Sequence, residues 1–344
     1  MDAARWPRLT DDLPGTGGEL RRVPEDFVVE ELPAFPPTGA GDHLWLWVEK
    51  RGTDTARVVK ALARTAGVAP AEVGYAGLKD RQAVTRQAFT VPLPRAGLGE
   101  LGLDGVRILA QERTARRLRT GQLRGNRFRI RIREAAEPAA AAAVLDALAR
   151  RGLPNYFGEQ RFGRAGDNAA RGRALLLGER LEPRVDRVER RLLLSAYQSL
   201  LFNRALAERM HDGLYAQALA GDVLRRADSG GLFLCEDPPV DQPRVDRLEV
   251  SPTGPIFGWK VRPLPAGAVA EREARLLAAE GLSPEAFRAG KGETEGARRA
   301  FAVPVEEVEL GPEGGDLLLA FTLPKGSYAT VLLDEVMKGP GLTA

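Results

Sequence analysis

Two kinds of hydrophobic pattern follow one another along this chain, and their order limits the fold more than any other feature. Strand-like alternation runs through residues 20–134 and returns near residue 303, whereas helix-like spacing begins at about residue 136. Strands that are separated by a long helical stretch, yet belong to one sheet, imply an insertion between them. We therefore expect an α+β protein in which one sheet domain is interrupted by a helical insertion.

The clearest expected strand is Asn126–Arg133, where polar and apolar residues alternate strictly. Its Phe and Ile residues fall on one side and its arginines on the other, which predicts a sheet with one buried face and one wet, basic face. A helix is expected from the N-cap candidates Thr53–Thr55 to Gly67. Further expected strands are 28–31, 43–48, 84–91, 305–310 and 317–323, and further helices are 139–151, 188–210 and 331–337.

Composition and missing motifs exclude several classes of protein. The chain has 344 residues, of which 44% are hydrophobic, so it is an ordinary globular protein. No apolar run approaches the ~20 residues that span a bilayer. Cys235 is the only cysteine, and His43 and His211 are the only histidines, which leaves little for disulfides, a metal centre or a Ser-His-Asp triad. Phosphate-binding, dinucleotide-binding and serine-elbow motifs are also missing. We expect a cytosolic protein that, if it is an enzyme, relies on carboxylate chemistry.

Arginine is concentrated in one part of the chain. Residues 113–133 contain nine arginines and no acidic residue. The planar guanidinium group binds phosphate through paired, charge-assisted hydrogen bonds. The run either contacts a nucleic-acid backbone or forms a solvated face, and the formal net charge of +3 is too small to decide between the two.

The segment Gly74–Thr85 places a carboxylate, Asp80, between Lys79 and Arg81, after a glycine-containing turn and before a strand-like run. A carboxylate on such a turn can point into a cleft, and neighbouring cations favour its ionised form. An ionised aspartate there is a candidate nucleophile or general base. Taken alone, the same three residues also fit a solvated polar turn.

Five segments of the sequence resemble the TruD family of tRNA pseudouridine synthases, in the order of that family and nearly from end to end. The segments are Pro24–Glu31, Tyr75–Thr85, Leu123–Phe128, Pro154–Gly163 and Leu323–Thr330. The resemblance implies a pseudouridine synthase-type catalytic domain with a central antiparallel or mixed sheet, formed by residues 1–152 and 303–344. It also implies an inserted α/β domain at residues 153–302. The implied reaction is the isomerisation of a uridine, typically at position 13 of tRNA, by a monomer without cofactor or metal.

The resemblance assigns a role to individual residues. Asp80 matches the catalytic aspartate, which either attacks the ribose C1′ or removes a sugar proton; the sequence leaves both routes open. Phe27 matches a substrate-contacting aromatic residue, since a flipped-out base needs an apolar face to stack on. Asn126 matches the substrate-site asparagine, which either orients Asp80 or contacts the nucleotide. Tyr328 stands where the family usually has Phe. It keeps the ring, but its hydroxyl needs a partner if it is buried.

Three more residues are expected to support the site. Arg21 and Lys79 are expected cationic partners of Asp80 or of a phosphate, although either residue also fits a surface charge. Phe128 is expected to pack beneath the site rather than to touch the substrate. An RNA-binding protein without catalysis is the main alternative, although an acid in a phosphate-binding groove is costly unless it has a function. An RNA nuclease or glycosylase that uses Asp80 is disfavoured because histidines and metal ligands are scarce.

Overall fold

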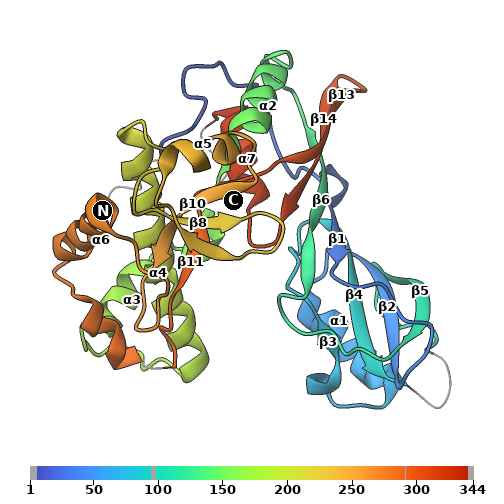
Figure 1. Cartoon of the computed structure of the whole chain (residues 1–344). Helices are drawn as coiled ribbons and strands as arrows, with labels where there is room; N and C mark the ends of the chain where they lie inside the picture. The colour runs from blue at the N-terminus through green and yellow to red at the C-terminus, as the bar shows by residue number, and fades with distance from the viewer. Residues whose placement is uncertain (1–5, 94–97, 291, 340–344) are drawn as a thin grey trace. The chain divides into compact units, whose positions relative to one another are not determined.

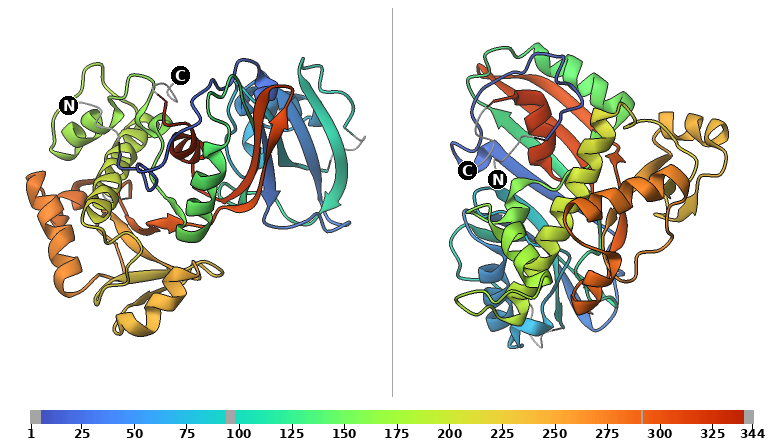
Figure 2. Two further views of the ribbon diagram at one scale, coloured as in Figure 1. Left: turned by 90° about the horizontal axis from the view of Figure 1, so that it is seen from above. Right: turned by 90° about the vertical axis from the view of Figure 1, so that its left-hand side faces the viewer.

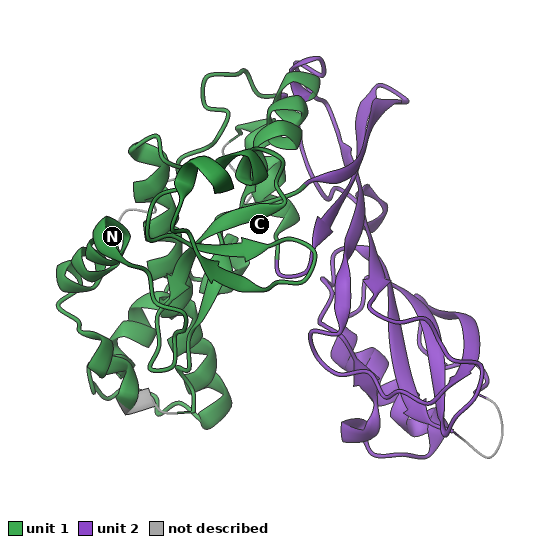
Figure 3. Ribbon diagram, viewed as in Figure 1, with its two compact units in different colours: residues 1–15, 142–304, 327–344 green, residues 16–141, 305–326 purple. Residues whose placement is uncertain are grey.

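The computed structural model describes residues 6–93, 98–290 and 292–339, which divide into two compact units. Unit 1 consists of residues 1–15, 142–304 and 327–344, and unit 2 of residues 16–141 and 305–326 (Figure 3). Unit 1 therefore takes in residues 142–152 and both chain ends besides the expected inserted domain. The expected domain boundaries remain a prediction.

Unit 2 is built on one eight-stranded sheet. Strands β1 and β4 pair in parallel and the other pairs are antiparallel, so the sheet is mixed. Together with the helices, this confirms the predicted α+β class and mixed central sheet. The order across the sheet is β13 (Glu306–Glu313), β14 (Asp316–Pro324), β6 (Leu123–Ile132), β1 (Phe27–Pro33), β4 (Val84–Pro92), β2 (His43–Arg51) and β5 (Val106–Thr114), with β3 (Gly74–Tyr75) paired to β4.

The sheet of unit 2 joins strands from both ends of the chain. β14 pairs with β6 over its whole length, and Phe321 lies opposite Phe128. The red C-terminal strands therefore lie beside the blue and green N-terminal ones in Figures 1 and 2. The strand-like patterns at the two ends of the sequence thus belong to one sheet.

Helix α1 (Thr55–Ala66) covers a core on this sheet. The Asp54 side chain caps the helix by accepting a hydrogen bond from the Arg57 amide at 2.9 Å, and Gly67 ends it at φ 69°. This confirms the expected helix. The core contains buried apolar residues of β2, β4 and α1, among them Leu46, Val58, Leu62 and Phe89.

Unit 1 contains two further sheets and most of the helices. One sheet has the order β11 (Ala297–Ala300), β10 (Val250–Ile256), β8 (Val223–Arg226) and β9 (Leu232–Leu234), and the other pairs β12 (Ala302–Val303) with β7 (Leu153–Pro154). Hydrophobic spacing alone indicated only the helices of this region, because short strands such as β9 carry too few residues for a period of two to be recognised. The α-helices besides α1 are α2 (Ala140–Arg151), α3 (Asn168–Leu176), α4 (Arg187–His211), α5 (Pro238–Asp246), α6 (Gly267–Ala279) and α7 (Ala329–Met337).

Helix α4 is the central helix of unit 1. Its residues Leu193, Tyr197 and Leu201 pack in one core with Phe257 and Phe287. In the part of the chain that the structure describes, no helix is long and apolar enough to cross a membrane. Short 3-10 helices connect the larger elements: η1 (Pro24–Asp26), η2 (Pro70–Glu72), η3 (Glu159–Phe162) and η4 (Pro284–Gly290).

Candidate active site

The structure brings six of the seven predicted site residues together in unit 2 and leaves one in unit 1. Tyr328, at the start of α7, belongs to unit 1. The six in unit 2 are Arg21, Phe27, Lys79, Asp80, Asn126 and Phe128.

Asp80 lies in the connection between β3 and β4, and several hydrogen bonds fix this connection. The carbonyl of Ala76 accepts from the Gly121 amide at 2.7 Å, and that of Gly77 from Gln87 Nε2 at 3.0 Å. The Lys79 amide donates to Thr55 Oγ1 at 3.0 Å. The loop is therefore tied to strand β4, to the first turn of α1 and to the segment before β6.

Gly74, the first residue of β3, has no room for a side chain. A β-carbon on Gly74 would overlap Thr90 Oγ1 and the Leu118 carbonyl oxygen. The same Thr90 hydroxyl accepts a hydrogen bond from the Leu118 amide at 3.0 Å. The close approach of these two segments sets the direction in which the loop leaves β3.

The carboxylate of Asp80 forms an ion pair with Arg21. Arg21 Nη2 lies 3.2 Å from Asp80 Oδ2, and the Asp80 side chain is 48% exposed while that of Arg21 is 18% exposed. Arg21 has a left-handed backbone at φ 57°, and its Cζ lies 4.2 Å from the centre of the Phe27 ring. One side chain thus contacts both a half-exposed carboxylate and an aromatic ring, a cation–π geometry.

Phe27 is buried in this structure. Its ring is 2% exposed and meets Phe128 edge to face at 6.3 Å, and Phe128 in turn stacks on Phe321 at 5.2 Å. Phe128 therefore packs within the sheet core. Stacking of a base on Phe27 requires Arg21 to leave the ring, so substrate contact by Phe27 stays a prediction.

Lys79 and Asn126 form a buried polar cluster with Glu31. Lys79 Nζ lies 2.8 Å from Glu31 Oε2 and donates to Asn126 Oδ1 at 2.8 Å. Glu31 and Asn126 face each other across β1 and β6, and Glu31 Oε1 also accepts from the Ala88 amide at 3.3 Å. The buried carboxylate, not Asp80, is thus the ionic partner of Lys79, because Lys79 points into the sheet while Asp80 points outward.

Tyr328 packs against the glycine-rich loop that follows β7. Its ring meets Phe157 edge to face at 6.0 Å and lies next to Gly158. Burial raises the pKa of Tyr328, and the guanidinium groups of Arg161 and Arg299 oppose this increase. Arg299 Cζ lies 4.1 Å from the Phe157 ring, so this part of unit 1 combines aromatic and cationic groups.

The arginines of β6 are paired with acids of unit 2. Arg127 lies 2.8 Å from Glu309, and Arg129 and Arg131 lie 3.4 and 3.0 Å from Glu313. Arg133 binds Asp26 through both carboxylate oxygens at 2.7 and 2.9 Å. The prediction that this face of the sheet is basic is therefore wrong, because β13 supplies carboxylates that the local sequence does not contain.

Sequence reasoning assigned no role to two charged residues that support the Asp80 loop. Glu31 is 1% exposed and holds Lys79. Lys50 is also 1% exposed, and its ammonium group donates to the main-chain carbonyl of Asp80 at 2.6 Å. A signal for Lys50 is present in the sequence, because it continues the buried positions Leu44, Leu46 and Val48 of β2.

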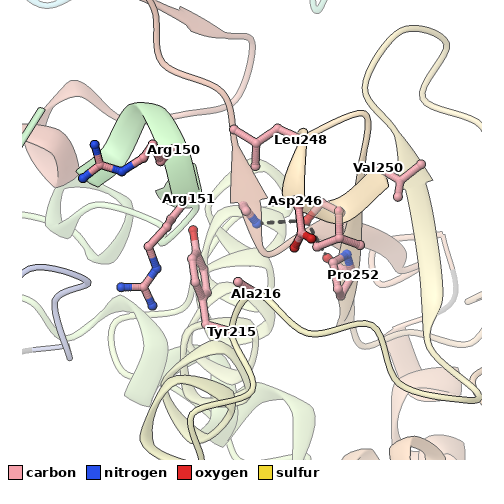
Figure 4. A pocket seen from close by; sticks show the side chains of 11 residues that line it. Arg150, Arg151, Tyr215, Ala216, Asp246, Leu248, Val250 and Pro252 are labelled. Carbon is pink, nitrogen blue, oxygen red and sulfur yellow. Dashed lines mark hydrogen bonds between the residues drawn. The ribbon is translucent and has the colours of Figure 1, made fainter. Parts of the chain in front are cut away.

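Two hollows lie apart from the predicted residues. A cavity of about 130 Å³ in unit 1 is lined by Arg150, Arg151, Tyr215 and residues of α5 and β10 (Figure 4). An open hollow of about 470 Å³ in unit 2 includes Arg57 and Thr53. Within the described residues, no group of three or more His, Cys, Asp or Glu side chains is arranged to hold a metal ion.

The chain matches known proteins over nearly its whole length. The family described as tRNA pseudouridine synthase D (TruD) matches residues 7–183 and 181–336. Proteins named tRNA pseudouridine synthase D are 54% identical in Anaeromyxobacter sp. strain Fw109-5, over 96% of both chains, and 48% identical in a strain of Thermus thermophilus, over 97% of this chain and 92% of that protein.

A solved structure from Methanosarcina mazei, described as a candidate tRNA pseudouridine synthase D, has the same fold. It superimposes with a TM-score of 0.76 at 24% identity and covers 97% of this chain and 96% of its own. Three findings point to the same family: the fold, the match over residues 7–336, and relatives that share about half of their residues with this chain. The chain belongs to the tRNA pseudouridine synthase D (TruD) family.

Proposed function

We propose that this protein is a tRNA pseudouridine synthase, an isomerase that converts uridine 13 of tRNA to pseudouridine. The observation that carries the proposal is Asp80, a half-exposed carboxylate held by Arg21 on a loop with a fixed main chain. Membership of the family supplies the reaction class, and the geometry of Asp80 supplies the group that performs it.

The reaction needs an ionised carboxylate. The C1′–N1 bond of the uridine breaks, the uracil turns, and a bond forms between C1′ and C5. C5 then loses its proton while N1 takes one up, so that the product is an isomer of the substrate. Asp80 starts the reaction either by attack on C1′ or by removal of a sugar proton, and Arg21 stabilises its negative charge in both routes. These steps are supplied by the chain and the substrate alone, so we propose no cofactor.

Substrate contacts follow from the surroundings of Asp80. When a base is bound, Arg21 leaves the Phe27 ring, and the ring and the amide of Asn126 become available to the nucleotide. Tyr328 is proposed as a further aromatic contact to the RNA. A base that is turned out of its stack gains an apolar face in this way.

The wider assignment is also proposed. The sheet of unit 2 represents the pseudouridine synthase-type catalytic domain, and residues 153–302 represent the inserted family domain. The protein acts as a monomer in the cytoplasm, with tRNA as its partner. The printed name of the relatives supports the substrate class, since they are called tRNA pseudouridine synthases.

The test uses Asp80→Asn, which keeps the shape of the side chain and removes the negative charge. Pseudouridine at position 13 of a tRNA transcript, mapped after incubation with the purified protein, should fall by at least 10³-fold, while tRNA affinity stays within about 3-fold. Asp104→Asn is the matched control, because Asp104 is an exposed aspartate of the same unit. An active Asp80→Asn protein would refute the role of Asp80. A wild-type protein that binds tRNA without modifying it would favour the non-catalytic alternative.

A further inference from the structure

Lys50 occupies a position in the core where the pattern of its strand predicts an apolar side chain. Buried residues alternate along β2 as Leu44, Leu46, Val48 and Lys50, and Lys50 is 1% exposed. A buried ammonium group is costly unless its hydrogen bonds and charge are satisfied. A position where a chain breaks its own pattern is often one that function requires.

The ammonium group joins two loops that are far apart in the sequence. Lys50 Nζ donates to the Thr53 carbonyl at 2.9 Å and to the Asp80 carbonyl at 2.6 Å. Thr53 directly precedes the cap of α1, and Asp80 carries the candidate catalytic carboxylate. A leucine or methionine at position 50 would fit the core but would leave both carbonyls without this donor.

Other contacts hold the loop on either side of Asp80, but among the described residues they do not reach the main chain of Asp80. Gln87 binds the Gly77 carbonyl, Thr55 binds the Lys79 amide, and Arg81 Nε donates to the Gly52 carbonyl at 3.3 Å. Among the described residues, the main chain of Asp80 receives its side-chain hydrogen bond from Lys50. The direction of the Asp80 side chain depends on this main chain.

We propose that Lys50 is a positioning residue for the reaction: its ammonium group fixes the main chain of Asp80 and thereby aims the carboxylate at the substrate. This inference rests on the proposed function of Asp80. It adds a second constraint to the one that Arg21 places on the carboxylate. Misplacement of a reacting group by about 1 Å can cost about 10²-fold in rate.

The charges around Lys50 make its hydrogen bonds to the two carbonyls depend on pH. Burial lowers the pKa of Lys50 to about 8, Asp80 and Asp54 raise it, and Lys79 lowers it. Lys79 is itself paired with Glu31, and the strand neighbours Thr85 and Val106 are uncharged. As the pH rises through about 8, the ammonium group loses its proton and with it the charge-assisted character of its hydrogen bonds. The rate should therefore fall as the pH rises through about 8.

Stability should change in the opposite direction over this range. The unfolded lysine, with an ordinary pKa, binds more protons than the folded one between pH 8 and 10.5, so the contribution of Lys50 to stability rises with pH. A loss of rate above pH 8 that accompanies unchanged or higher stability cannot come from unfolding. This separates positioning from a purely structural role.

The test compares Lys50→Met with Lys60→Met, which removes an exposed lysine from α1. In single-turnover assays with saturating tRNA transcript, Lys50→Met should form pseudouridine about 10²-fold more slowly. Its tRNA Kd should stay within about 3-fold, and its rate should no longer fall above pH 8. Lys60→Met should behave as the wild type. The proposal would be overturned if the rate of Lys50→Met were within 3-fold of the wild-type rate. It would also be overturned if the rates of Lys50→Met and of the wild type fell in the same way above pH 8.

Two further measurements keep the outcomes separate. Amide hydrogen exchange of residues 76–82 without RNA should be faster in Lys50→Met. Hydrogen exchange tests the role of Lys50 even if the wild-type protein forms no pseudouridine. That result would refute the proposed function but not the effect of Lys50 on the loop. If Lys50→Met does not fold, ¹³C-lysine NMR of the wild type, with seven lysines in the sequence, gives the titration of Lys50. A midpoint more than one pH unit from that of the rate would exclude Lys50 as the positioning group.

Discussion

The ion pair between Lys79 and Glu31 allows the sharpest prediction about the support of the site. Lys79 is 7% and Glu31 1% exposed, and their charged atoms lie 2.8 Å apart. Lys79→Met keeps most of the stem and removes the ammonium group, so the Glu31 carboxylate keeps one backbone donor, the Ala88 amide. Breaking a buried pair in this way costs about 3–5 kcal/mol.

Protonation of the glutamate limits this cost. Protonating a glutamate that has the ordinary solution pKa of about 4.3 costs about 3.7 kcal/mol at pH 7. This cost falls by about 1.4 kcal/mol with each pH unit below 7. We therefore expect Lys79→Met to lower the free energy of unfolding by about 3–4 kcal/mol at pH 7. At pH 5.5 the loss should be smaller by about 2 kcal/mol.

Urea unfolding followed by circular dichroism at pH 7 and pH 5.5 measures both values. Adding Glu31→Gln to Lys79→Met should recover most of the loss at pH 7, because the double variant leaves no unpaired charge at these two positions. Lys60→Met, at an exposed position, should change the free energy of unfolding by less than about 0.5 kcal/mol. If Lys79→Met lowered the free energy of unfolding by less than about 1 kcal/mol at pH 7, or by the same amount at both pH values, the Lys79–Glu31 ion pair would not stabilise the fold through its charges.

Two further predictions concern other charged groups of unit 2. Burial would raise the pKa of Asp26, but hydrogen bonds from Arg133 and from the Val23 amide outweigh burial and lower this pKa. The ionised Asp26 therefore stabilises the fold at pH values above the unfolded pKa, and this stabilisation is lost as the pH falls through the folded pKa. Asp26→Asn should thus lower the free energy of unfolding, measured by thermal melts, by about 1.5–3 kcal/mol at pH 6 and by less at pH 2. An equal loss at the two pH values would refute this prediction. For RNA binding, Arg124→Ala, at an exposed side chain, should lower the slope of log Kd against log salt by about one, whereas Arg129→Ala, whose partner is Glu313, should change it less. Equal slopes for both variants would show that pairing does not decide which arginines contact phosphate.

Local patterns predicted much of unit 2. The cap Asp54 and the terminal Gly67 mark the two ends of α1, because capping and left-handed geometry depend on single residues. The alternation of Phe128 and Ile130 with arginines placed β6 and its buried face, because the strand period is two. Such signals arise within a few residues and need no knowledge of the partner strand.

Features that depend on distant segments could not be predicted in the same way. β6 and β13 are about 180 residues apart in sequence, and only their common pairing with β14 brings Arg127 close to Glu309. The arginines of β6 therefore look uncompensated in the sequence, although Arg127, Arg129 and Arg131 are ion-paired in the fold. The same holds for Arg21, whose contacts with Phe27 and Asp80 depend on how the chain before β1 folds back over the sheet.

The cations around Asp80 show why neighbours in sequence are poor guides to neighbours in a site. Lys79 is adjacent in sequence, but its buried side chain pairs with Glu31, while the half-exposed side chain of Asp80 pairs with Arg21. The carboxylate is instead held by Arg21, 59 residues earlier, and the main chain by Lys50, 30 residues earlier. Side chain and main chain of one residue are thus fixed by separate cations, so each can be removed without removing the other. Loss of Arg21 should remove the ionic partner of the Asp80 carboxylate, whereas loss of Lys50 should change the direction of that carboxylate.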